Sequence, residues 1–168
     1  MPSSKPLPPP DKWHLSWEEF QMRTSALLGE IRRRTSPAAT PMAVLALGRG
    51  ASPLAAVLAN VFGVKMYYLG LSSYKEDDSQ GHLQVFQELT PILKKHLQTW
   101  GRHLLVVDDI WDTGRTFQHA RGVFPHAMFA ALLVKDLEGQ DNLDPKLVWA
   151  TEVGPKVWVE FPWEKNYG

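Results

Sequence analysis

Short runs of consecutive apolar residues alternate along this chain with segments of helical periodicity. Strands that are buried on both faces have this appearance. The runs predict strands at residues 43–47, 64–69, 104–107, 127–134 and 147–149. The predicted helices lie before and between them, at about residues 17–34, 53–62, 91–99 and 116–122. This alternation predicts an α/β protein with a mainly parallel sheet flanked by helices, in which ligands bind beyond the carboxyl ends of the strands.

Local signals mark the ends of two of these helices. Ser16 and Glu19 have the spacing of a capping box, and Thr90 followed by Pro91 is typical of a helix start. The basic run at residues 32–34 favours a helix end, because cations in a last turn complement the helix dipole. An anion-binding patch is the less favoured interpretation of that run.

The segments outside this pattern are rich in proline or polar residues. Residues 1–14 contain five prolines before residue 11 and are predicted to form a flexible arm, which leaves residues 15–168 as one domain. A polar stretch at about residues 72–83 is predicted to be a mobile loop. The chain ends in an irregular, aromatic segment at residues 157–163.

Composition and charge exclude several classes of protein. Lys plus Arg and Asp plus Glu each number 18, so the net charge is zero, which argues against a nucleic-acid-binding protein. The absence of cysteine excludes disulfides, thiolate catalysis and cysteine-based zinc sites. No apolar run reaches the ~18 residues of a membrane span, and the N-terminus lacks the apolar core of a signal peptide. A cytoplasmic protein without a membrane span is predicted.

The residues that follow the third strand carry the clearest chemistry. The strand delivers Asp108 and Asp109 to its carboxyl end, and Asp112 then precedes the small and hydroxyl-bearing run Thr113–Thr116 at a helix start. Free N–H groups at such a start bind anions, and a glycine lets a phosphate approach closely. Carboxylates accept hydrogen bonds from ribose hydroxyls and ligate Mg²⁺. A sugar phosphate with vicinal hydroxyls satisfies both demands, whereas the alternative is a solvated acidic loop.

Two further residues have a chemical and an ordinary interpretation. Lys135 follows the fourth strand, where a group that only donates would favour a carbonyl over an amino group of a ligand. It could equally be an exposed lysine at the start of a loop. Trp158 on its own is more typical of a core or interface position.

Other common motifs are not supported. The segment Gly48–Pro53 begins like a dinucleotide-binding fingerprint, but Pro53 occupies the position of the third glycine. The sequence holds no phosphate-binding loop of the nucleotide-triphosphatase type, and its six histidines show no metal-binding spacing.

The stretch Val107–Thr116 resembles the phosphoribosyl-diphosphate (PRPP) signature of the type I phosphoribosyltransferases. The wider chain, from about Trp17 to Trp163, is similar to the bacterial xanthine-guanine (6-oxopurine) branch of that family. Further matching segments are residues 47–50, 71–74, 124–127, Lys135 and 158–163. The resemblance implies the type I phosphoribosyltransferase fold, with a small irregular hood from about residue 147 to 168.

The resemblance also implies a role for each matching residue on the PRPP side. The 5′-phosphate would be held by Thr113, Gly114, Arg115 and Thr116. Asp108 and Asp109 would meet the ribose hydroxyls, and Asp109 would bind Mg²⁺. Arg49 and Gly50 match a short diphosphate-binding loop that contains a cis peptide bond.

On the base side, Asp112 matches the residue that exchanges a proton with N7 of the purine. Lys135 matches the donor to the 6-oxo group. Trp158 matches the ring that stacks on the base, and Val159 the neighbour whose backbone meets the purine edge. The resemblance further implies a homodimer or homotetramer.

These expectations combine into a purine salvage enzyme that moves the phosphoribosyl group of PRPP to N9 of guanine, xanthine or hypoxanthine with Mg²⁺. Gly81 stands where the family has an arginine that reaches the diphosphate. That departure favours an alternative, a PRPP- or nucleotide-binding regulatory protein of the same fold. A transferase for another acceptor base is a third possibility.

Overall fold

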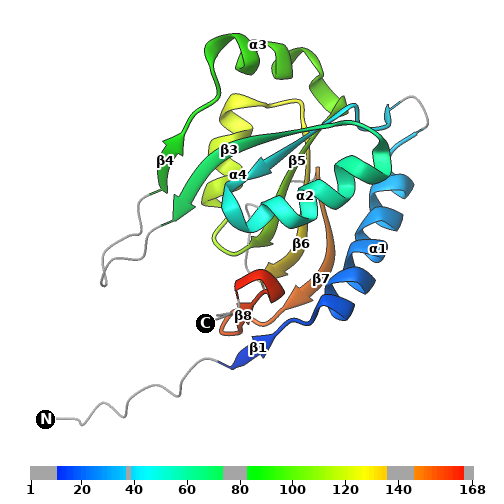
Figure 1. Ribbon diagram of the computed structural model, residues 1–168, viewed down its shortest axis with the longest axis vertical. Helices are drawn as coiled ribbons and strands as arrows, with labels where there is room; N and C mark the ends of the chain where they lie inside the picture. Colours follow the sequence, from blue (N-terminus) through cyan, green and yellow to red (C-terminus); the bar gives the residue numbers. More distant parts are fainter. Residues whose placement is uncertain (1–10, 37–38, 74–82, 136–145, 165–168) are drawn as a thin grey trace, which may run out of the picture.

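A six-stranded sheet forms the centre of the computed structural model, which describes residues 11–36, 39–73, 83–135 and 146–164. From edge to edge the strands are β4 (Leu83–Gln87), β3 (Lys65–Ser73), β2 (Ala43–Leu47), β5 (Leu104–Trp111), β6 (Met128–Lys135) and β7 (Leu147–Val153) (Figure 1). Neighbouring strands from β3 to β7 are parallel, and β4 is antiparallel to β3. The prediction of a mainly parallel sheet is confirmed.

The edge strand β4 is an element that the sequence pattern did not predict. Its half-buried Leu83 and Val85 alternate with exposed Gln84 and Phe86, which is the pattern of a strand with one face in solvent. Such a short alternation next to a polar stretch is a weak signal. The predicted mobile loop, about residues 72–83, lies between β3 and β4, and its residues 74–82 fall outside the described part of the chain.

Two layers of helices cover the sheet. Helices α1 (Trp17–Arg34) and α2 (Gly48–Phe62) pack on one face, and α3 (Pro91–Thr99) and α4 (Arg115–Val123) on the other. Alternate residues of β5 therefore enter opposite cores: Leu105 and Val107 face α1 and α2, whereas Leu104 and Val106 face α3 and α4. Burial on both faces explains why the strands are continuously apolar.

The start and end of α1 agree with the sequence signals. The Glu19 N–H donates to Ser16 Oγ at 3.1 Å, and the Ser16 N–H donates to Glu19 Oε2 at 2.8 Å, which completes the capping box. The basic run closes the helix, and Arg34 donates to the Leu147 carbonyl of β7 at 3.1 Å. The interpretation of that run as a helix end is confirmed.

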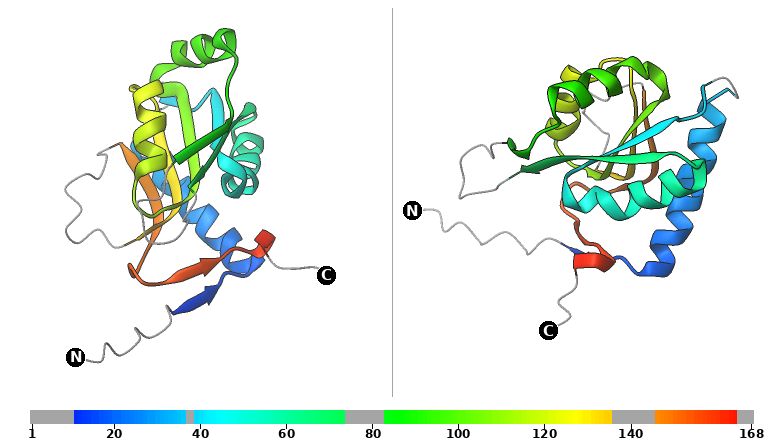
Figure 2. Two further views of the ribbon diagram at one scale, coloured as in Figure 1. Left: turned by 90° about the vertical axis from the view of Figure 1, so that its left-hand side faces the viewer. Right: turned by 45° about the horizontal axis from the view of Figure 1, so that its top comes forward.

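The C-terminal segment forms a small hood beside the sheet, together with residues from the N-terminus. Strand β8 (Trp158–Glu160) pairs in parallel with β1 (Lys12–His14), and the 3₁₀ turn η3 (Pro162–Glu164) follows (Figure 2). Two boundaries therefore differ from those expected. Residues 12–14, assigned to the arm, belong to the folded domain, and β7, assigned to the hood, is the edge strand of the central sheet.

None of the helices in the described part of the chain is long and apolar enough to cross a membrane.

Candidate active site

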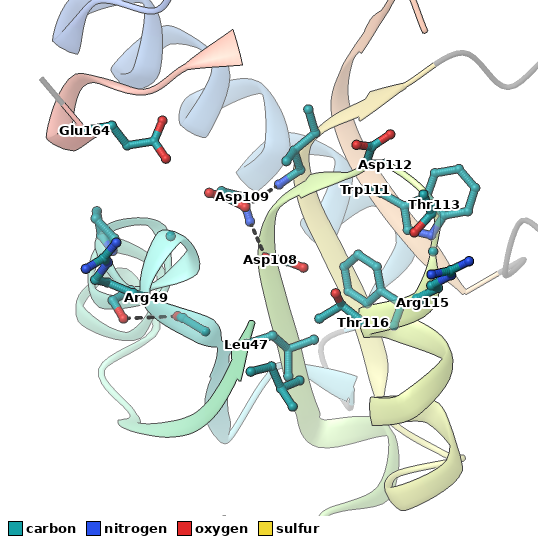
Figure 3. Close-up of a pocket in the computed structure, with 18 of the residues that line it drawn as sticks. Leu47, Arg49, Asp108, Asp109, Trp111, Asp112, Thr113, Arg115, Thr116 and Glu164 are labelled. Carbon is teal, nitrogen blue, oxygen red and sulfur yellow. Dashed lines mark hydrogen bonds between the residues drawn. The ribbon is translucent and has the colours of Figure 1, made fainter. Parts of the chain in front are cut away.

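A cavity of about 1070 Å³ opens at the carboxyl ends of β2 and β5. Its walls come from the first turn of α2, the end of β5, the loop into α4, and η3 of the hood (Figure 3). The lining includes most residues that the sequence singled out: Arg49, Gly50, Asp108, Asp109, Asp112, Thr113, Gly114, Arg115 and Thr116. The parallel sheet brings them together because the carboxyl ends of parallel strands meet at one edge.

Asp108 and Asp109 form the floor of this cavity. The Asp109 N–H donates to Asp108 Oδ1 at 3.0 Å, and the Ile110 N–H donates to Asp109 Oδ1 at 2.8 Å. Burial, reinforced by the Asp109 charge, raises the pKa of Asp108 well above its ordinary value. Burial also raises the pKa of Asp109 to about 6, and the charge of Glu164 acts in the same direction. The cavity therefore favours a ligand that supplies positive charge or hydrogen-bond donors to these carboxylates.

The loop from β5 into α4 is shaped to receive an anion. Gly114, at the start of α4, has φ +75°, a left-handed conformation that glycine adopts without strain. A Cβ at this position would lie 2.8 Å from Cζ2 of Trp111, so the buried indole and the loop backbone are in close contact. The N-cap residue is a glycine and so offers no side-chain cap, and the first N–H groups of a helix point out of its N-terminal end.

The first turn of α2 forms the opposite wall. The sequence predicts a loop from Gly48 and a helix from Pro53, but the helix begins at Gly48. Arg49, its second residue, is exposed. Gly48 has φ +70° and lies against the Leu71 carbonyl, where a Cβ would be 2.6 Å from the oxygen. A Cβ on Gly50 would collide with the Asp109 carboxylate, so glycine is required for this approach. The peptide bonds of the described residues are all trans, and the cis bond implied for Arg49–Gly50 is therefore not present.

Asp112 and Lys135 form an ion pair at the ends of β5 and β6. Lys135 Nζ lies 3.1 Å from Asp112 Oδ2, with the lysine side chain 13% and the aspartate side chain 41% exposed. The two residues are 23 positions apart in sequence, but Asp112 directly follows β5 and Lys135 ends β6, which is the adjacent parallel strand. The pair places Asp112, a potential proton acceptor that lines the cavity, beside the cation of Lys135, which lies outside the lining.

The hood contributes residues other than those expected. Trp158 is 53% exposed and Val159 is packed in the core, and neither lines the cavity. Trp163 and Glu164 line it instead, although the sequence analysis assigned no role to them. An aromatic cluster explains their placement: the Trp163 ring stacks on Phe161 at 4.9 Å and meets Phe20 of α1 edge-on at 5.2 Å. No local sequence signal distinguishes Glu164 from an ordinary surface acid.

The side chains divide the cavity into three regions. Figure 3 shows Asp109 and Asp108 at the centre, Arg49 and Glu164 on one side, and the loop of Thr113–Thr116 on the other. An elongated ligand with an anionic group at each end and hydroxyls between them matches this distribution of charge and donors.

The phosphoribosyl transferase domain family matches residues 15–152. The chain belongs to this family. Three solved structures share the fold of this phosphoribosyltransferase over more than nine-tenths of its length. A hypothetical protein from Neisseria gonorrhoeae with bound ppGpp is 19% identical, with a TM-score of 0.76 over 94% of this chain and 92% of that one.

The other two similar structures are of proteins named as phosphoribosyltransferases. The purine phosphoribosyltransferase of Pyrococcus horikoshii is 19% identical, with a TM-score of 0.67 over 94% of this chain and 97% of that one. The xanthine-guanine-hypoxanthine phosphoribosyltransferase of Helicobacter pylori is 18% identical, with a TM-score of 0.62 over 91% and 93%. The expected type I phosphoribosyltransferase fold is thereby confirmed.

Asp109 of this phosphoribosyltransferase fits the Mg²⁺ ion that the resemblance implies. Mg²⁺ is usually held by one or two carboxylates together with substrate phosphates. Asp109 offers hard oxygen donors on the cavity floor, and a cation there would oppose the rise in its pKa. Across the described residues, no group of three or more His, Asp or Glu side chains gathers as a metal cage.

Proposed function

We propose that this protein transfers the 5-phosphoribosyl group of PRPP to N9 of a 6-oxopurine, with Mg²⁺, and releases diphosphate. The observation that carries the proposal is the order of groups in the cavity: Arg49, then the Asp108–Asp109 pair, then the Gly114 loop. PRPP has the same order, with a diphosphate, two ribose hydroxyls and a 5′-phosphate.

Each end of PRPP has its own set of donors in this arrangement. The N–H groups of the loop at Gly114, with the hydroxyls of Thr113 and Thr116, bind the 5′-phosphate. Arg49 and the first N–H groups of α2 face the diphosphate. Asp108 and Asp109 accept hydrogen bonds from the ribose hydroxyls, and bound Mg²⁺ supplies charge neutralisation for the diphosphate.

The proposed reaction is a displacement at C1′ of the ribose. The bond from C1′ to the diphosphate oxygen breaks, and diphosphate leaves with the electron pair while N9 of the base forms the new bond. The proton on N7 of the base passes to the Asp112 carboxylate, a transfer typically worth ~10²–10⁴ in rate. The cavity residues contribute by orienting the two reactants and by stabilising the charge on the leaving group.

The Asp112–Lys135 pair supports a 6-oxopurine as the acceptor. Its ammonium can donate to the 6-oxo group but cannot accept from the amino group of adenine. The carboxylate beside it faces N7 on the same edge of the purine. When the base binds, its O6 and N7 replace the direct contact between the two side chains.

The test is diphosphate release with PRPP and Mg²⁺, run in parallel with guanine, xanthine, hypoxanthine, adenine and orotate. Turnover confined to 6-oxopurines is expected. Turnover with adenine or orotate instead would overturn the choice of base and support a transferase for another acceptor.

A second candidate function is a nucleotide-binding regulator on the same fold. The specific observation that favours it is the bound ppGpp in the Neisseria gonorrhoeae structure, because ppGpp is a purine nucleotide that carries diphosphate groups. Gly81, in place of the family arginine, lies outside the described residues and points the same way. Tight binding of PRPP or ppGpp by calorimetry, with no turnover of any base, would favour this candidate over the enzyme.

A further inference from the structure

Trp111, the last residue of β5, belongs to the wall of the cavity. Only 4% of the residue is exposed, and its side chain is part of the core cluster that also contains Phe117 and Phe129. Figure 3 shows it beside Thr113, on the opposite side of the cavity from Arg49. The core therefore holds this ring in a fixed position at the loop end of the site.

The edge of the ring that carries the indole nitrogen packs against Gly114. A Cβ on this glycine would lie 2.9 Å from Cε2 and 3.0 Å from Nε1 of Trp111. Gly114 is the N-cap residue of α4, and its carbonyl accepts a hydrogen bond from the Gln118 N–H at 2.8 Å, which starts the helix. The indole nitrogen therefore lies next to the helix start, where the backbone N–H groups have no partner within the helix.

The indole N–H of Trp111 has no acceptor within the described part of the chain. The indole nitrogens of Trp100 and Trp163 also have none there, but those two are buried out of reach of solvent. The Trp111 nitrogen is not among these sealed groups, and the residue lines the cavity, so a ligand there can reach it. Since buried donors in folded proteins almost always have a partner, a ligand in the cavity is expected to supply the acceptor.

The surroundings of this N–H favour an anionic acceptor. The start of α4 attracts negative charge through its free N–H groups and its dipole, and Arg115 in the first turn places a cation in the cavity wall. An indole N–H can only donate, so it adds to this set of donors without accepting from any of them. We infer that the Trp111 indole N–H donates to an oxygen of the 5′-phosphate and forms part of the phosphate site. This inference rests on the proposed function, which places the 5′-phosphate at the Gly114 loop.

NMR of the indole N–H groups in the unmodified protein tests this contact directly. The ligand is ribose 5-phosphate, which carries the phosphate and the sugar without a base. The Nε1–H signal of Trp111 is expected to move downfield during the titration, because its proton comes to lie on a phosphate oxygen. The signal of Trp100, which does not line the cavity, is expected to stay in place. A Trp111 signal that does not move at saturation would overturn the inference.

A substitution measures what the contact contributes to affinity. Trp111→Phe removes the N–H and keeps an aromatic ring in the core. Calorimetry should show that ribose 5-phosphate binds about tenfold more weakly, or weaker still, which is the order expected for the loss of a hydrogen bond to a charged group. Guanosine, which lacks the phosphate, should bind within about twofold of the unmodified protein. The matched control is Trp100→Phe, because it also removes an indole N–H without a partner, but outside the cavity.

The two measurements together separate a hydrogen bond from a packing effect. Weaker binding of ribose 5-phosphate by Trp111→Phe without the downfield shift in the unmodified protein would mean that the ring only supports the loop, and would overturn the inference. An equal loss of ribose 5-phosphate and guanosine would do the same. If the unmodified protein turns over no purine, the proposed function fails, while the titration with ribose 5-phosphate still decides the role of Trp111.

Discussion

Individual glycines decide how closely the walls of the cavity approach one another. Gly50 leaves room for the Asp109 carboxylate, and Gly114 lets the loop backbone lie on the ring of Trp111. Both positions exclude a Cβ by contact, and Gly114 excludes it by its positive φ as well. These contacts join Asp109, the Gly114 loop and the first turn of α2 into one arrangement.

Gly114→Ala is therefore expected to weaken binding of the 5′-phosphate. The new Cβ must displace the Trp111 ring or turn the loop, and a strained φ adds a cost of about 1–3 kcal/mol. Ribose 5-phosphate affinity, measured by calorimetry, should fall at least about tenfold. Gly122→Ala is the matched control, because Gly122 lies in α4 with nothing within 4 Å of a Cβ. Equal affinity of the two variants would contradict the role given to Gly114.

At the scale of elements, adjacency of β5 and β6 creates the Asp112–Lys135 pair. Asp112 directly follows β5, and Lys135 ends β6. The register that pairs Trp111 with Val134 brings the carboxyl ends of the two strands level. Helix α4 then returns along the sheet and presents the Gly114 loop beside the same edge. The Asp112–Lys135 pair thus depends on two adjacent strands, whereas the Gly114 loop is placed by β5 and the turn that follows it.

Lys135→Ala is expected to reduce kcat/KM for 6-oxopurines by ~10–100-fold, since a hydrogen bond to a charged group contributes about 1.5–3 kcal/mol. PRPP binding should be nearly unchanged, because Lys135 does not line the cavity. The measurement is diphosphate release with each base in turn. Lys65→Ala, at the opposite end of the sheet, serves as control. An equal loss of activity with every base tested would remove Lys135 from base recognition.

At the scale of the whole molecule, buried Asp108 and half-buried Asp109 link ligand binding to stability. Burial raises the pKa of both carboxyls above their ordinary values, that of Asp109 to about 6. Between pH 4 and pH 6 the folded protein therefore holds a proton that the unfolded chain has released. The free energy of unfolding therefore falls as the pH rises through this window, because the folded protein must release the proton of Asp109. The whole of this loss of stability is present above pH 6.

Asp109→Asn is accordingly expected to raise the free energy of unfolding at pH 7.5 by about 1–2 kcal/mol, with little effect near pH 4. The same change should abolish Mg²⁺-dependent binding of PRPP. Urea unfolding at the two pH values, and PRPP titration with and without Mg²⁺, are the measurements. Glu88→Gln, which removes an exposed carboxylate, is the control for stability. A destabilised Asp109→Asn variant at pH 7.5 would contradict this account of the pair.

Much of this architecture follows from the sequence by local rules. Strands buried on both faces must be apolar throughout, so β2, β5 and β6 are visible as runs, and the capping box and basic last turn delimit α1. The run from Asp108 to Thr116 is contiguous, so its chemistry can be recognised without a structure. Because carboxyl ends of parallel strands meet at one edge, the sequence also predicts that Arg49 and Gly50 lie near the run from Asp108 to Thr116, and both line the cavity.

Tertiary structure decides what depends on contacts between distant segments. Strand β4 forms because β3 offers it an edge, and helix α2 extends back to Gly48 because Gly48 and Gly50 can approach Leu71 and Asp109. Pairing with β8 gives residues 12–14 a place in the hood, and aromatic packing on α1 brings Glu164 to the cavity. Such placements arise from long-range packing, whose energy is shared among residues with no local pattern in common, so no window of the sequence contains them.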